Sequence, residues 1–121
     1  GNWGKPPFPQ YGDLNQALAE TDSTTLKILM SHDPSHWKGE ILGHKNIFLT
    51  LSGHTHAAQM AFNMYGKLRS PSSLIYDEWD GLYQEGEQYL YVNRGLGFIG
   101  IPVRLGVARP EVTVITLRTK K

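Results

Sequence analysis

Two short apolar segments that each end in a histidine-bearing turn constrain this chain more than any other feature. Residues 26–30 are followed at once by Ser-His-Asp-Pro at 31–34, and residues 46–52 by Gly-His-Thr-His at 53–56. Apolar runs of this length, bounded by turn-forming residues, are typical of buried strands in an α/β sheet. Ligands of such sheets bind at the carboxyl ends of the strands, so both turns are candidates for a functional site.

The remaining patterns predict a mixed α/β fold within one small domain. Asp13 is a good N-cap for a helix, and three prolines within residues 6–9 exclude a helix before it. The β-branched alternation of 111–117 predicts a strand. The expected elements are helices at 14–20 and 35–42, strands at 26–30, 46–52, 89–93 and 111–117, and loops with short strands over 57–88.

Composition excludes some classes of site and leaves the cellular compartment open. The chain has no cysteine, so disulfides and thiolate metal sites are excluded. A net charge of +1 gives no electrostatic reason to expect nucleic acid or an acidic membrane as a partner. No apolar run approaches the roughly 20 residues that cross a bilayer. The chain begins with Gly1 rather than Met, which suggests a processed or trimmed product.

Three of the five histidines lie where predicted strands end. His54 and His56 are two residues apart, so in extended backbone their side chains leave the same face. If the two strands are parallel neighbours, His32 converges on the same place. Neutral imidazole is a common ligand of zinc, manganese or iron, although a short histidine spacing also arises by chance. His36 and His44 are expected to be surface or capping residues.

These segments resemble the last two motifs of the calcineurin-like metallophosphoesterases. In that family a strand ends in Ser-His-x-Pro and a later strand in Gly-His-Thr-His, as at 28–34 and 51–56, and the 22-residue separation of His32 and His54 fits. Residues 91–97 and 110–117 resemble a bacterial branch whose phosphohydrolases are often held at the membrane or exported. The resemblance covers nearly the whole chain.

The resemblance implies a site, a reaction and a fold. His32 and His54 would bind one metal of a pair, and His56 the other. The two divalent ions, of manganese, iron or zinc, would clamp a phosphate group and activate water for phosphatase or phosphodiesterase chemistry. The substrate would be a phosphorylated small molecule or lipid. The fold would be the C-terminal portion of a two-sheet α/β sandwich with helices outside.

Three motifs that precede these in the family are missing from the chain. There is no Asp-x-His, no Gly-Asp-x-x-Asp and no Gly-Asn-His followed by Asp or Glu, and Gly12-Asp13 is no substitute. We therefore expect residues 1–121 to be the C-terminal part of a domain whose N-terminal half is its partner. Alone, the chain is expected to bind at most one metal weakly, to hydrolyse little, and to self-associate through exposed strands.

Two alternative functions and one further residue complete the sequence-based hypotheses. The chain is either part of the phosphoesterase, a noncatalytic metal-binding or interaction module, or a mononuclear hydrolase on its own.

Arg94 follows the strand at 89–93, and a guanidinium binds phosphate oxygens in a bidentate manner. It is therefore a candidate for substrate binding, and the alternative is an ion pair with a nearby carboxylate. Ala57-Ala58 stands where many relatives have two glycines, and alanine restricts the backbone there.

Overall fold

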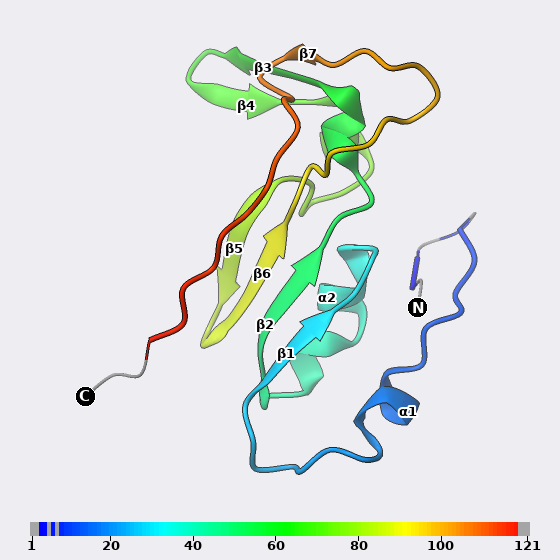
Figure 1. The fold of residues 1–121 in the computed structure, drawn as a ribbon, viewed down its shortest axis with the longest axis vertical. Coiled ribbons are helices and arrows are strands. Elements are labelled where there is room, and N and C mark those ends of the chain that lie inside the picture. Colours follow the sequence, from blue (N-terminus) through cyan, green and yellow to red (C-terminus); the bar gives the residue numbers. More distant parts are fainter. Residues whose placement is uncertain (1–2, 5, 7, 119–121) are drawn as a thin grey trace.

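The computed structural model describes residues 3–4, 6 and 8–118 and contains two sheets, one beyond the other along the long axis (Figure 1). The strands are β1 (Lys27–Met30), β2 (Ile47–Ser52), β3 (Met60–Met64), β4 (Lys67–Arg69), β5 (Gly81–Glu85), β6 (Gln88–Val92) and β7 (Leu105–Gly106). The α-helices are α1 (Leu14–Leu18) and α2 (Ser35–Gly39), and 3₁₀ turns lie at Ile41–Gly43, His56–Gln59 and Pro71–Leu74.

The larger sheet has the order β1-β2-β6-β5 and is mixed. β1, β2 and β6 run parallel, and β5 pairs antiparallel with β6. The α/β fold class predicted from the sequence is therefore correct, as are the strands around 26–30, 46–52 and 89–93. Helix α1 begins where expected, since the Asp13 carboxylate accepts a hydrogen bond from Gln16 N at 2.8 Å. It ends at Leu18, two residues earlier than predicted.

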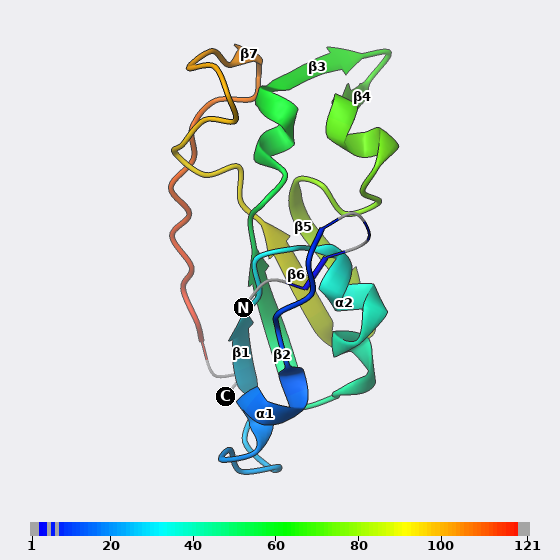
Figure 2. The same ribbon diagram turned by 90° about the vertical axis from the view of Figure 1, so that its right-hand side faces the viewer.

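Helices cover one face of this sheet and form the main core with it. In Figure 2, α2 lies against that face, while the C-terminal segment runs along the opposite one. Trp37 of α2 and Ile41 after it are buried against Leu90 and Val92 of β6. Burying side chains of this size contributes about 1.5–3 kcal/mol each, so this layer anchors the strands whose ends carry the histidines.

The opposite face is only partly covered, and this corrects one prediction. β1 was expected to be a buried strand, but Ile28 is 45% and Met30 82% exposed. The reason is that β1 is an edge strand with a helix layer on one side only, so alternate side chains meet solvent within the described chain. The apolar residues of β1 predict a strand, but they do not tell which face of that strand is covered by another layer.

The strand predicted at 111–117 is wrong, because this segment is extended but pairs with no described strand. It crosses the face of the sheet instead of adding to its edge (Figure 2). Side chains hold it there: Tyr91 donates from its hydroxyl to Glu111, and Asn93 Nδ2 donates to Thr113 Oγ1 at 2.8 Å. Over the face, its backbone has no ladder of N–H and C=O groups to join.

The smaller sheet has the order β4-β3-β7. β3 pairs antiparallel with β4 and parallel with the two-residue strand β7, which the sequence pattern did not predict. The expectation of loops and short strands over 57–88 is confirmed. No helix in the part of the chain that the structure describes has the length and apolar character needed to cross a bilayer.

His36 is not the surface residue that the sequence suggested. It is 5% exposed, its Nδ1 lies 2.7 Å from Ser31 Oγ, and its Nε2 lies 3.1 Å from the Glu40 carboxylate. Its ring stacks on Trp3 with centroids 4.9 Å apart. His36 therefore ties α2 to the residue that precedes His32, and burial lowers its pKa below the ordinary 6.5, against the opposing effect of Glu40.

This buried histidine predicts a loss of stability in mild acid. Its folded-state pKa is depressed, so the unfolded chain takes up the proton more readily. The free energy of unfolding should be undiminished above about pH 6.5 and should fall as the pH drops below that value. Urea denaturation at pH 7.5 and 5.5 measures the difference. A His36→Gln variant should lose part of this pH dependence, whereas His44→Gln serves as the matched control. Equal pH dependence in wild type and His36→Gln would contradict the assignment.

Candidate metal centre

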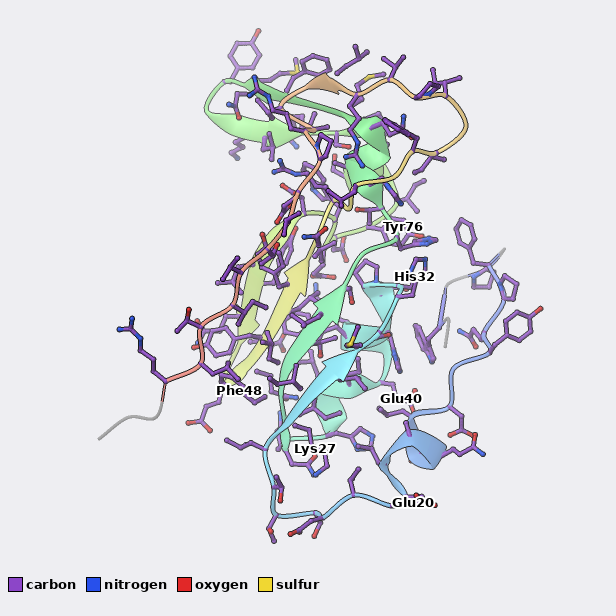
Figure 3. All side chains as sticks on the ribbon, viewed as in Figure 1. Glu20, Lys27, His32, Glu40, Phe48 and Tyr76 are labelled. Atoms are coloured by element: carbon purple, nitrogen blue, oxygen red, sulfur yellow. The ribbon has the colours of Figure 1, made fainter. Side chains whose placement is uncertain are left out.

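The carboxyl ends of β1 and β2 bring two histidines into contact. The strands are parallel neighbours, and Gly53 N donates to His32 O at 3.1 Å just beyond them. As a result His54 Nδ1 lies 3.0 Å from His32 Nε2. Figure 3 shows His32 beside Tyr76 at this end of the sheet, with Lys27 at the other end of β1. The approach of His32 and His54 expected from parallel pairing is therefore observed.

The spacing of these two nitrogens suits a shared metal ion. Two neutral imidazole nitrogens at 3.0 Å either share one proton or hold one cation between them. Ligands about 2.1 Å from an ion, at tetrahedral or octahedral angles, lie about 3.0–3.4 Å from each other. Burial also lowers the pKa of His54, which favours the neutral form that binds metals. The donor pair therefore fits a divalent transition metal.

The other side of the His54 ring faces two further residues. Its Nε2 lies 2.9 Å from the Tyr76 hydroxyl and 3.7 Å from Oδ2 of Asp33, a fully buried carboxylate. That oxygen has no hydrogen-bond partner, whereas Oδ1 accepts from the Ser35 backbone and side chain. A proton on Nε2 can be donated to Tyr76, which leaves the lone pair on Nδ1 free. Burial and the negative field of Asp33 raise the pKa of Tyr76 to about 12, so its hydroxyl stays neutral.

His56 lies on the same cavity but faces a cation. A cavity of about 430 Å³ is lined by His32, His54 and His56. His56 Nδ1 lies 3.4 Å from Arg104 Nη2, and burial followed by this arginine lowers its pKa. In the described ranges, 3–4, 6 and 8–118, no three His, Asp or Glu side chains form a group that could hold a metal ion. The roles of the three histidines as ligands therefore stay predictions.

The backbone around these histidines is left-handed over an unusual length. His54 has φ of 68°, and His56, Ala57, Ala58 and Gln59 have φ between 46° and 56°. Each non-glycine residue in this region costs about 1–2 kcal/mol. The surrounding structure holds the turn, because Ser70 Oγ donates to Ala57 O at 2.6 Å. The two alanines thus occupy a conformation that glycine favours, which is the restriction that their sequence suggested.

Relief of this strain is measurable at Ala58. Glycine adopts left-handed backbone without penalty but loses more entropy on folding, so Ala58→Gly should raise the free energy of unfolding by about 0.5–1 kcal/mol. Ala17→Gly, in the right-handed helix α1, is the matched control and should lower it by about 0.5–1 kcal/mol. Urea denaturation of both variants provides the comparison. Destabilisation of equal size at both positions would contradict the strain at residue 58.

Arg94 is engaged by a carboxylate and does not line the histidine cavity. Its Nε and Nη2 bind the two oxygens of Asp80 at 2.5 and 2.7 Å, and Nη1 donates to Val107 O at 3.0 Å. The hydrogen bonds that Arg94 donates to Asp80 raise the pKa of Arg94 above its ordinary value. The ion pair that was the alternative to substrate binding is thus present, and the substrate role stays a prediction.

Sequence reasoning missed the residues that support the histidines. Tyr76 lies 22 positions after His54 and carries no motif that marks it as a partner. Arg104 donates from Nη2 to the carbonyls of Arg94, Gly95 and Gly97 at 2.6–3.1 Å, which places its charge beside His56. Such contacts depend on tertiary structure between segments far apart in the chain. Asp33 was the exception, because its position next to His32 in the sequence could have marked it as a residue near the histidines.

The sequence is similar to several curated proteins over most of its length. It is 36% identical over 108 residues to the uncharacterized metallophosphoesterase YkuE of Bacillus subtilis, which is 88% of this chain and 36% of that protein. It is 37% identical over 108 residues to the transmembrane protein with metallophosphoesterase domain of Bos taurus, covering 88% and 23% respectively. An uncharacterized metallophosphoesterase of Aquifex aeolicus is 32% identical over 111 residues, or 91% and 40%.

The chain spans well under half the length of each of these relatives. No family model matches the sequence, and no solved structure matches it significantly. Its two sheets with few helices are consistent with the C-terminal portion of a metallophosphoesterase α/β sandwich. Several relatives that share a third or more of the aligned residues carry the same family name, so this chain is related in sequence to the metallophosphoesterases.

Proposed function

We propose that the protein containing this chain hydrolyses phosphoesters with a pair of divalent metal ions. The observation that carries the proposal is the 3.0 Å approach of His32 Nε2 and His54 Nδ1 at the ends of two parallel strands. The names of the relatives support the same reaction. When bound, manganese, iron or zinc would neutralise phosphate oxygens and make water a stronger nucleophile.

In this proposal the chain supplies three metal ligands and their support. His32 and His54 hold one ion and His56 the other. The Tyr76 hydroxyl fixes the His54 ring from its far side, as outer residues do for metal-bound imidazoles, and the Asp33 carboxylate lies 3.7 Å from the same nitrogen. Buried surroundings keep His54 and His56 neutral and ready to bind. Arg104 adds a positive charge beside His56, where a phosphate oxygen would be attracted.

Arg94 is less well placed than Arg104 to contact the substrate. A direct contact with phosphate would require its guanidinium to leave Asp80, whose carboxylate is largely buried. Removing one partner of such a pair leaves an uncompensated charge, which costs about 3–5 kcal/mol. We therefore infer that Arg94 acts on the site chiefly by fixing the loop that carries Gly95 and Gly97 next to His56.

The rest of the site is proposed to lie in the longer protein. Residues 1–121 would be the C-terminal part of one phosphoesterase domain, and its other half would provide a bridging carboxylate, an asparagine ligand and a group that assists the leaving oxygen. Three neutral imidazoles leave the charge of a dication uncompensated, so the segment alone should bind metal weakly. Attachment of the longer protein to a membrane is part of the proposal, since one relative is named a transmembrane protein.

The first test compares two histidines in the intact protein. His54→Ala should lower kcat/KM for a generic phosphomonoester or phosphodiester in the presence of Mn²⁺ by at least about 100-fold, with loss of bound metal measured by elemental analysis. His44→Ala removes a histidine outside the cavity and should change neither quantity. The 121-residue chain alone should show negligible turnover. Metal-dependent turnover by this chain, lost on His54→Ala, would instead identify a mononuclear hydrolase.

Other results assign a different function. If the intact protein binds Mn²⁺ through His54 but hydrolyses neither substrate, the chain belongs to a noncatalytic metal-binding module. If His54→Ala leaves both metal content and kcat/KM unchanged, the proposed site is wrong.

A second test addresses Tyr76 as a positioning residue. Tyr76→Phe keeps the ring and removes the hydroxyl that faces His54 Nε2. Metal affinity should fall by about 10-fold, and excess Mn²⁺ should restore much of the activity. The thermal unfolding temperature of the metal-free protein should change little. A large drop in that temperature with unchanged metal affinity would assign Tyr76 to the core alone.

A further inference from the structure

An apolar groove adjoins the histidine cavity. The groove has a volume of about 240 Å³, and Ala58 and Ile99 line both it and the cavity that contains the histidines. Beyond Ile99 the groove is lined by Ile101, Val103 and Leu105, and by Met60, which pairs with Leu105 across β3 and β7. None of the residues that line the groove is charged. The groove therefore adjoins the histidine cavity at Ala58 and Ile99, and its lining is apolar apart from Gln59.

The loop that forms the groove wall is held by one buried amide. Gln59 is buried, and its Nε2 donates to Ile101 O at 2.8 Å and to Val103 O at 2.6 Å. Its Oε1 accepts a hydrogen bond from Ile99 N. The side chain of Gln59 thus hydrogen-bonds to the backbone of all three residues and fixes the path of the loop. The apolar side chains of the loop are exposed while its backbone is held in place.

The apolar side chains of the groove are unusually exposed for a fixed loop. Ile101 is 66% exposed, and Ile99, Val103, Leu105 and Met60 are also exposed to solvent. Scattered exposed apolar residues are ordinary, but a contiguous group beside a polar cavity marks a binding surface. The combination of imidazoles at one end and hydrocarbon along the other matches a ligand with a charged head and an apolar tail.

We propose that this groove binds the hydrocarbon chain of an amphiphilic phosphoester whose phosphate lies at the histidines. The inference rests on the proposed function and specifies its substrate class. In the reaction the oxygen of water bonds to phosphorus, the phosphorus–oxygen ester bond breaks, and the leaving oxygen takes up a proton.

The first experiment measures binding without turnover. Alkylphosphonates with 2 to 12 carbons, which lack a cleavable ester oxygen, are titrated into the intact Mn²⁺-loaded protein below their micelle concentrations. Affinity should rise by about three- to fourfold for each methylene group that the groove buries, and then level off. Affinity that does not depend on chain length would overturn the inference.

Substitutions in the groove test whether the groove causes the dependence of affinity on chain length. Ile101→Asp and Val103→Asp should reduce the affinity of the 12-carbon ligand towards that of the 2-carbon ligand. Tyr65→Asn replaces a fully exposed apolar residue of the β3–β4 turn that does not line the groove, and should keep the full chain-length effect. Retention of the effect in both aspartate variants, or its loss in the Tyr65 control, would contradict the assignment to this groove.

Activity separates failure of this inference from failure of the proposed function. If the intact protein hydrolyses neither short-chain nor long-chain phosphoesters, the proposed function is wrong. If it hydrolyses both with equal kcat/KM, only the groove assignment is wrong. If the long-chain ester is hydrolysed with the higher kcat/KM, it is next presented either as monomers or in phosphatidylcholine vesicles. This comparison tells whether the substrate is a membrane lipid or a soluble amphiphile. Faster turnover in vesicles indicates a membrane lipid, and faster turnover of monomers indicates a soluble amphiphile.

Discussion

The candidate site depends on the parallel pairing of β1 with β2. Backbone hydrogen bonds continue past the strands, from Ser31 N to Leu51 O at 3.0 Å and from Gly53 N to His32 O at 3.1 Å. This register sets where both strands end and brings the rings of His32 and His54 together. A slip of one residue would turn the side chains of β1 to the opposite face and separate the two rings. The positions of the residues that line the histidine cavity depend on this register.

The strained backbone beyond β2 is supported by structure that follows it in the chain. Residues 56–59 are left-handed, and the polar side chains of Ser70 and Ser72 bind the carbonyls of Ala57 and Thr55. Thr55 Oγ1 in turn donates to Trp79 O at 2.7 Å. The segment after the β3–β4 hairpin thus holds the turn that carries His56. Strain of this kind persists only where neighbouring groups over-determine the conformation, and such places cluster at functional sites.

The sequence predicted the elements that local signals define and missed those that depend on neighbours. The strand ends at His32 and His54, the Asp13 cap and the α/β class follow from periodicity, turn residues and capping chemistry. The 111–117 segment has strand-like residues, but whether it pairs depends on where another backbone lies. Burial of His36 and the Arg94–Asp80 ion pair likewise arise from tertiary contacts. Alternation identifies two faces of a strand without revealing which one is covered.

The way Gln59 holds the loop at 99–103 has an evolutionary consequence. All three of its hydrogen bonds go to backbone atoms, so the path of the loop does not depend on the identity of the side chains displayed there. Residues at 99, 101 and 103 can therefore exchange without unfolding the turn that carries His56. If the proposed groove and metal site are correct, related proteins with the same histidines would diverge in ligand preference through substitutions in this loop.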